Sequence, residues 1–178
     1  MTFIAPGGSD AGLVDLGRRW QAARALPLGC RLGPASPALQ PAASPMPTAA
    51  PTLALAVVGA HLAGMPLHGQ LAEQGCRLRA RTQTAPHYRL YALPGTTPPK
   101  PGLARVSAGG SAIALEVYDM PLAAVGAFLA LIAPPLGLGS VQLADGSWVK
   151  GFICEGAALA GALDITAFGG WRAWLASR

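Results

Sequence analysis

The sequence is poor in charge and in side chains that exchange protons near neutral pH. Charged residues make up 12% of the 178 residues, about half of the roughly 25% typical of soluble proteins. Long apolar runs are also missing, because no window reaches about 18 uninterrupted apolar residues. The longest candidate, residues 120–138, is broken by Pro121, Pro134 and Pro135. We therefore expect no membrane span, and only three histidines are available for proton transfer.

Signatures of several enzyme and cofactor classes are absent as well. The sequence contains no G-x-S-x-G, no P-loop, no dinucleotide fingerprint and no H-E-x-x-H, so no cofactor is implied. Its cysteines, Cys30, Cys76 and Cys154, are odd in number and far apart, with no C-x-x-C pair and no histidine at zinc spacing. We interpret them as reduced, buried thiols of a cytoplasmic protein without a metal site. No basic start precedes an apolar core, so we expect no secretion signal.

The net charge of +5 comes from eleven arginines and two lysines against eight acidic residues. The densest cluster is C-R-L-R-A-R, in which Arg77, Arg79 and Arg81 alternate as they would on one face of a strand. A solvated strand face explains such a run. Nucleic-acid binding would require interleaved aromatic residues and a known module, and neither is present.

The chain divides into three predicted parts. Residues 1–29 read as a short strand, Thr2–Ala5, followed by an amphipathic helix that begins at Asp10. Residues 30–52 form a linker rich in proline and alanine, which has too few large apolar groups to fold. Residues 53–178 form the remaining domain.

That domain alternates strand-like runs with turns and has few helices. We predict strands over residues 53–58, 76–82, 88–93, 103–107, 112–118, 140–143 and 148–154, and helices over residues 67–74, 122–132 and 169–176. Because the helices are not regularly interleaved with the strands, a doubly wound parallel sheet is disfavoured. The pattern predicts an α+β fold around a curled or barrel-like mixed sheet with a few flanking helices.

The best placed histidine lies in V-V-G-A-H-L-A-G-M-P-L, residues 57–67. There an apolar strand breaks at Gly59, and His61 follows in the turn. The N–H groups of residues 59–64 could converge on an anion. Glycines at a strand end are also ordinary turn residues, and His61 could then be a packed turn histidine.

Other polar residues are candidates for the same site. Lys150 lies inside the apolar strand W-V-K-G-F, where a charge needs water, an anion or a partner, for which Glu155 is the alternative to a ligand. Lys100 lies in a proline-rich turn and receives no role. His87 and Tyr91 are typical packing residues with polar tips, and we keep both as candidates for binding.

Five motifs together resemble the C-terminal domain of bacterial allophanate hydrolase: G-A-H-L-A-G-M-P-L, T-A-P-H-Y-R-L-Y-A-L-P-G, P-P-K-P-G-L, D-G-S-W-V-K-G-F and D-I-T-A-F-G-G-W-R-A-W-L. The resemblance runs from about Leu53 to the end. It implies a fold similar to γ-glutamyl cyclotransferase. Residues 1–29 resemble the last strand and helix of the amidase domain, but no segment matches the Ser-Ser-Lys triad of amidases. The resemblance therefore implies no amidase activity in this chain.

In that family the amidase step yields N-carboxycarbamate, and the C-terminal domain is thought to decarboxylate it in urea catabolism. Such a substrate carries a carboxylate at both ends and needs a proton on nitrogen. Our hypothesis is that the amides of Gly59, Ala60 and Leu62 could hold one carboxylate, Lys150 the other, and His61 could supply the proton.

Two other functions remain open at this point. The domain could mainly organise assembly, either with a separate amidase chain or as a homo-oligomer. Cyclotransferase activity is the less favoured alternative, because Val58 replaces the family's tyrosine before Gly59 and the only central acid is Glu116.

Overall fold

The computed structural model describes Gly8, residues 10–24 and residues 50–178. The chain separates into two units, residues 1–46 and residues 47–178. In the first, helix α1 (Asp10–Arg24) begins where the sequence predicts it and carries an Arg19–Asp15 ion pair one turn apart, at 3.0 Å. The predicted strand at residues 2–5 and nearly all of the predicted linker lie outside the described residues.

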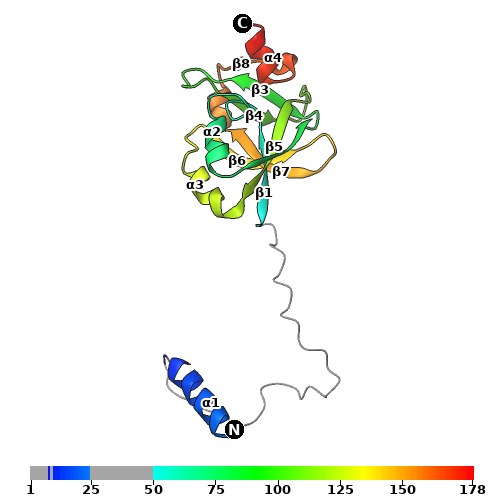
Figure 1. Ribbon diagram of the computed structural model, residues 1–178. Helices are drawn as coiled ribbons and strands as arrows, with labels where there is room; N and C mark the ends of the chain where they lie inside the picture. The colour runs from blue at the N-terminus through cyan, green and yellow to red at the C-terminus, as the bar shows by residue number, and fades with distance from the viewer. Residues whose placement is uncertain (1–7, 9, 25–49) are drawn as a thin grey trace. The chain divides into compact units, whose positions relative to one another are not determined.

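A five-stranded mixed sheet forms the centre of the second unit (Figure 1), with the strand order β2-β5-β1-β7-β6. Its strands are β1 (Thr52–Val57), β2 (Arg77–Gln83), β5 (Ala114–Pro121), β6 (Leu136–Gln142) and β7 (Trp148–Cys154). The central strand β1 runs antiparallel to β5 and parallel to β7. Leu55, Ala56 and Val57 are at most 1% exposed, which is why β1 reads as a continuous apolar run rather than an alternating one.

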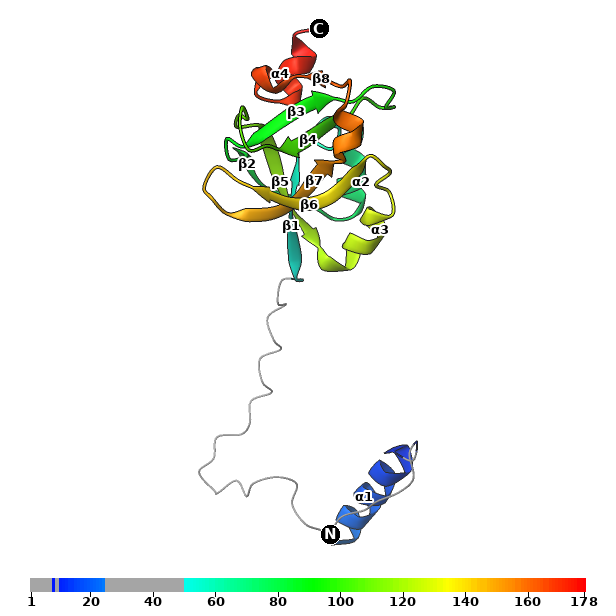
Figure 2. The same ribbon diagram turned by 180° about the vertical axis from the view of Figure 1, so that it is seen from behind.

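A second, three-stranded sheet has the order β4-β3-β8, formed by β3 (Tyr88–Ala92), β4 (Pro101–Arg105) and β8 (Leu163–Asp164). The helices are α2 (His68–Glu73), α3 (Val125–Leu129) and α4 (Trp171–Ala176), with 3-10 turns at Leu122–Ala124, Gly156–Leu159 and Thr166–Phe168. Figures 1 and 2 show α2 and α3 on the same side of the five-stranded sheet. The predicted α+β class is confirmed, and the described strands form two open sheets rather than a closed barrel.

Several predicted elements have other bounds in the structure: β4 and β5 are each displaced by two or three residues, and β6 and the helix predicted over residues 122–132 differ more. Strand β6 begins at Leu136, four residues before the predicted start, because Gly137 and Gly139 weaken the strand pattern of its first half. Gly139 is needed there, since a Cβ would come within 2.5 Å of the Ile153 side chain. The helix predicted over residues 122–132 is a 3-10 turn followed by the short helix α3. No helix among the described residues has the length and apolar character to cross a membrane.

The arginine alternation in β2 is broken by a register shift. Leu78 pairs with Tyr118 and Ala80 pairs with Val117, so Arg79 is an extra residue opposite β5. Strict alternation would place Arg77, Arg79 and Arg81 on one face of β2. The extra residue changes the register after Leu78, so that Arg81 pairs with Glu116. All three arginines of β2 are exposed, but Arg79 and Arg81 also form ion pairs, with Asp119 and Glu116.

Candidate functional site

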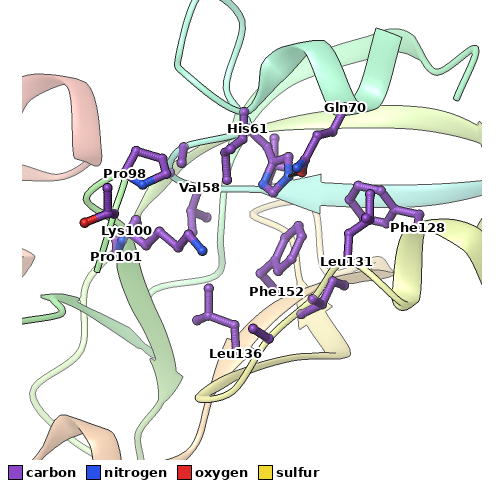
Figure 3. A pocket seen from close by; sticks show the side chains of 17 residues that line it. Val58, His61, Gln70, Pro98, Lys100, Pro101, Phe128, Leu131, Leu136 and Phe152 are labelled. Atoms are coloured by element: carbon purple, nitrogen blue, oxygen red, sulfur yellow. Dashed lines mark hydrogen bonds between the residues drawn. The ribbon is translucent and has the colours of Figure 1, made fainter. Parts of the chain in front are cut away.

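A cavity of about 230 Å³ opens where β1 ends. One wall is the loop after β1, with Gly59, Ala60 and His61, and another is the segment from Thr97 to Pro101. The remaining walls are largely apolar and come from α3, the start of β6 and Phe152 of β7, with Gln70 of α2 as a further polar member. Figure 3 shows Lys100 entering beside Pro98 and Pro101, with Phe128 and Leu131 on the other side of the His61 ring and Phe152 beneath it.

Three consecutive backbone donors of the loop have no partner among the residues that the structure describes. The N–H of Leu62 donates to the Gly59 carbonyl at 3.0 Å, and the N–H of Leu67 donates to the Ala60 carbonyl at 2.9 Å. The N–H groups of Gly59, Ala60 and His61 have no acceptor in the part of the chain that the structure describes. Successive unpaired amides at the edge of a cavity suit an anion.

Gly59 allows the two polar walls of the cavity to approach each other. A Cβ at position 59 would overlap the ring of Pro101, the residue that follows Lys100. The glycine is therefore required by close packing, and the sequence pattern had shown it only as a turn residue.

Replacing Gly59 with alanine should force Pro101 and Lys100 away from the loop. We expect Gly59→Ala to lower the free energy of unfolding by about 1–3 kcal/mol, the usual cost of overpacking a filled site. Gly126→Ala is the matched control, because position 126 lies in α3 and a Cβ added there would have nothing within 4 Å. Urea unfolding measures both variants, and equal midpoints would contradict the packing argument.

The His61 ring is held in a defined position. Its Nε2 lies 2.8 Å from Oε1 of Gln70, and the tautomer with hydrogen on Nε2 makes this a hydrogen bond and leaves the lone pair on Nδ1. The ring stacks on Phe152 at 5.0 Å between centroids and meets the edge of Phe128 at 5.6 Å. Burial lowers the pKa of His61, the Gln70 bond opposes this, and the positive charge of Lys100 lowers it further. The imidazole is therefore neutral at neutral pH.

Lys100 is the cation of the cavity. It is half-buried, and its ammonium group has no carboxylate or hydrogen-bond partner among the described residues. No Asp or Glu lines the cavity. The backbone of Lys100 is fixed by a bond from its N–H to Thr96 Oγ1 at 2.9 Å, and its carbonyl accepts from the N–H of Leu93 at 3.1 Å. Sequence reasoning gave this lysine no role, although its rigid proline-rich turn was a usable signal.

The structure does not bring Lys150 to His61. Lys150 is exposed on β7, does not line the cavity, and donates to Ser140 Oγ of the neighbouring strand at 3.2 Å. The alternative partner, Glu155, forms no ion pair with it in the described chain. Lys100 lies in the cavity where Lys150 was predicted to bind, because the tight turn before β4 folds back against the end of β1.

Three other candidates also lie elsewhere. The N–H of Leu62 is used within the loop, and its side chain is buried beside a different cavity. His87 is exposed near Arg105, and Tyr91 is half-buried in β3. Of the residues proposed from the sequence, the cavity contains Gly59, Ala60 and His61.

No metal site is apparent among the described residues, where no three His, Cys, Asp or Glu side chains gather closely enough to hold an ion. Cys76 and Cys154 are half-buried free thiols, and burial raises the pKa of both. Cys30 lies outside the described residues.

Comparison with known families decides the membership of the chain. The family model described as the allophanate hydrolase C-terminal domain matches residues 53–176. This chain belongs to that family. The γ-glutamyl cyclotransferase-like fold expected from the sequence is confirmed with it.

Relatives of this family differ greatly in length. Urea amidolyase of Saccharomyces cerevisiae is 49% identical over 127 residues, which are 69% of this chain and 7% of the yeast protein. A Kluyveromyces lactis allophanate hydrolase structure is 40% identical, with a TM-score of 0.71, over 95% of this chain and 29% of that one. A protein specific to uropathogenic E. coli is 32% identical, with a TM-score of 0.66, over 71% of this chain and 98% of that one. The family domain thus occurs both inside much longer proteins and as nearly a whole chain.

Proposed function

We propose that this chain binds N-carboxycarbamate in the His61 cavity and decarboxylates it. The observation that carries the proposal is a cation without an acidic partner, Lys100, in the same small cavity as His61 and three backbone N–H groups that have no acceptor among the described residues. Such a set of donors favours a compact anion with charge at two ends. Since buried charges require partners, a dianion supplies what the cavity lacks.

The proposed step needs one proton and no cofactor. The bond between nitrogen and one carboxylate carbon breaks, that carbon leaves as CO2, and the electron pair stays on nitrogen. Nitrogen then takes a proton, so that the dianion and one proton become CO2 and carbamate. In this assignment the amides of residues 59–61 hold one carboxylate and Lys100 holds the other.

His61 supplies the proton through a change in its own charge. Its pKa is lowered in the free protein by burial, with Lys100 contributing. A bound dianion offsets Lys100 and raises the pKa of His61, because a nearby negative charge favours imidazolium. The Nε2–H bond to Gln70 leaves Nδ1 as the nitrogen that gains and delivers the proton.

The apolar walls favour the same reaction. Phe128 is fully buried and Phe152 nearly so, and these two rings limit the water on their side of the ligand. Electrostatic attraction is stronger where water is excluded, and the leaving CO2 is uncharged. A volume of about 230 Å³ also suits a ligand smaller than a typical drug molecule.

Cyclotransferase activity is less well supported. The central acid Glu116 does not line the His61 cavity, and its carboxylate already accepts from four donors. The cavity therefore offers no free carboxylate for that reaction.

The substrate would be supplied by an amidase, which this chain does not resemble beyond residues 1–29. The match to K. lactis allophanate hydrolase over 95% of the chain supports this assignment for the N-terminal residues. The proposal places the chain in urea breakdown in the cytoplasm, acting after an amidase domain or a separate amidase chain.

Two measurements test the function. Malonate, a stable dianion of similar size, should shift the NMR signals of His61 and of the amides of residues 59–61. The chain should also accelerate CO2 release when an amidase lacking this domain generates N-carboxycarbamate from allophanate, relative to the same amidase alone. Absence of both effects would overturn the proposal and favour the assembly role.

A further inference from the structure

The strongest polar network of the described chain lies outside the His61 cavity and centres on Glu116. This residue of β5 is 3% exposed, and both carboxylate oxygens are fully engaged. Oε2 accepts from the N–H of Ala63 at 2.7 Å and from the Tyr118 hydroxyl at 2.9 Å. Oε1 accepts from Arg81 Nε and from Arg172 Nη2, each at 3.2 Å.

Donors on both oxygens keep this carboxylate charged. Burial by itself would raise the pKa of Glu116, but the bonds from Ala63, Tyr118 and Arg81, with the charge of Arg172, hold that pKa below its usual value. The same environment, burial first, raises the pKa of Tyr118 to about 12, so the phenol remains a donor. Glu116 therefore holds its four donors throughout the neutral pH range.

Two members of the network, Glu116 and Arg172, form hydrogen bonds with the loop that carries His61. Glu116 accepts from the N–H of Ala63, and Arg172 of α4 donates to the carbonyl of Ala63 at 2.7 Å. Both backbone polar groups of Ala63 are thus fixed by two side chains that are also paired with each other. Ala63 follows His61 by two positions.

These two hydrogen bonds join the loop to residues that are distant in sequence, Glu116 of β5 and Arg172 of α4. The other hydrogen bonds of residues 59–67 in the described chain join them to one another or to residues up to 70. Nothing else among the described residues anchors the loop's backbone by hydrogen bonds to a distant strand or helix. Among the hydrogen bonds of the described chain, these two connect the loop with the amides of residues 59–61 to β5 and α4, and the buried residues Ala60 and Leu62 add packing contacts.

We infer that Glu116 and Arg172 are positioning residues that hold the His61 loop in its anion-binding conformation from the opposite side of the loop. This inference rests on the proposed function, and it assigns neither residue a contact with substrate. It also explains why Glu116 of β5 is paired with Arg172 of α4, although the two residues lie more than fifty positions apart in sequence.

Arg81 offers a matched control for Arg172. Both arginines bond the same oxygen of Glu116 at the same 3.2 Å distance, and both are substantially exposed, with 67% and 46% of their side-chain surface accessible. Only Arg172 also bonds the loop. Arg172→Gln and Arg81→Gln therefore remove comparable ion pairs but differ in the loop contact.

We expect Arg172→Gln to weaken malonate binding and to lower the decarboxylation rate by about tenfold or more, since small displacements of a site cost this much. The NMR titration of His61 and the amide signals of residues 59–61 should shift in this variant without any ligand. Arg81→Gln should leave all of these within about twofold of the wild type. Arg172→Lys, which keeps a charged donor, should partly restore binding.

The outcomes separate the two proposals. If wild-type protein neither binds malonate nor accelerates CO2 release, the proposed function fails, while the unliganded His61 titration still tests the positioning. If wild-type protein binds and the two Gln variants behave alike, the positioning inference is overturned. Thermal unfolding verifies that both variants fold, and the Arg172→Lys and Arg81→Lys pair replaces them if Arg172→Gln does not.

Discussion

Replacing His61 with asparagine should remove most of the acceleration of CO2 release, about 10²- to 10⁴-fold, the usual contribution of a positioned proton donor. Asparagine keeps a polar side chain that can still bond Gln70, but it has no group that carries a transferable proton near neutral pH. The measurement is CO2 release from N-carboxycarbamate generated by a separate amidase. Spontaneous breakdown of this labile substrate sets the lowest rate observable.

His68→Asn is the matched control for this prediction. His68 is half-buried near the ring of Tyr118, at 5.9 Å between centroids, and does not line the cavity. The charge of His68 contributes the smallest share of the lowering of the His61 pKa, so we expect the rate of this variant to stay within about twofold of the wild type. Equal losses of the CO2 release rate in the two variants, or no loss in His61→Asn, would contradict the assignment of His61 as the proton donor.

The pH dependence of malonate binding follows from the same residue. The pKa of His61 is lowered in the free protein, and a bound dianion raises it, so binding takes up a proton between the two values. Affinity should therefore increase as the pH falls from above the bound-state pKa, and it should level off below the free-state pKa. His61→Asn controls for the titration of malonate itself and should lose only the protein's part of this dependence.

Replacing Lys100 with methionine should weaken malonate binding by about 10- to 100-fold, because a hydrogen bond to a charged group contributes about 1.5–3 kcal/mol. Methionine retains the length and apolar stem of lysine and lacks only the charge. The expected loss is large because Lys100 has no acidic partner among the described residues that would already neutralise it. Isothermal titration calorimetry gives the affinities.

Lys150→Met distinguishes the two lysines of the chain. Lys150 is exposed and bonded to Ser140, so its loss should change malonate affinity less than about twofold. The methionine at position 100 should also raise the pKa of His61 in the free protein, since the charge of Lys100 lowers it. Strong binding by Lys100→Met together with weak binding by Lys150→Met would restore the assignment made from the sequence.

Local patterns in the sequence were sufficient for much of the fold and for the centre of the site. The apolar run ending at Gly59 predicted β1 and the turn with His61. Asp145-Gly146, a dipeptide typical of hairpin turns, lies between β6 and β7, with Gly146 at positive φ. Strand β7 has the predicted bounds, Trp148–Cys154. Such features depend on neighbours in sequence, which is why the sequence alone reveals them.

Tertiary structure alone decided which charges meet. Lys150 looked functional because a lysine in an apolar strand needs a partner, yet β7 pairs with β6 and exposes that side chain. Lys100 reaches His61 because Gly59 leaves space for Pro101, a contact across more than forty residues. The extra residue Arg79 in β2 likewise places Arg81 opposite Glu116, against the simple alternation.

By itself, then, the sequence determined the α+β class, the family, and the loop in which His61 lies. It could not show that Lys100 is the lysine of the cavity, or that Glu116 and Arg172 bind the backbone of Ala63. The physical reason is that strand order, register and close backbone approach bring together residues that are far apart in sequence. The local sequence around one of these residues does not indicate which distant residue it will contact.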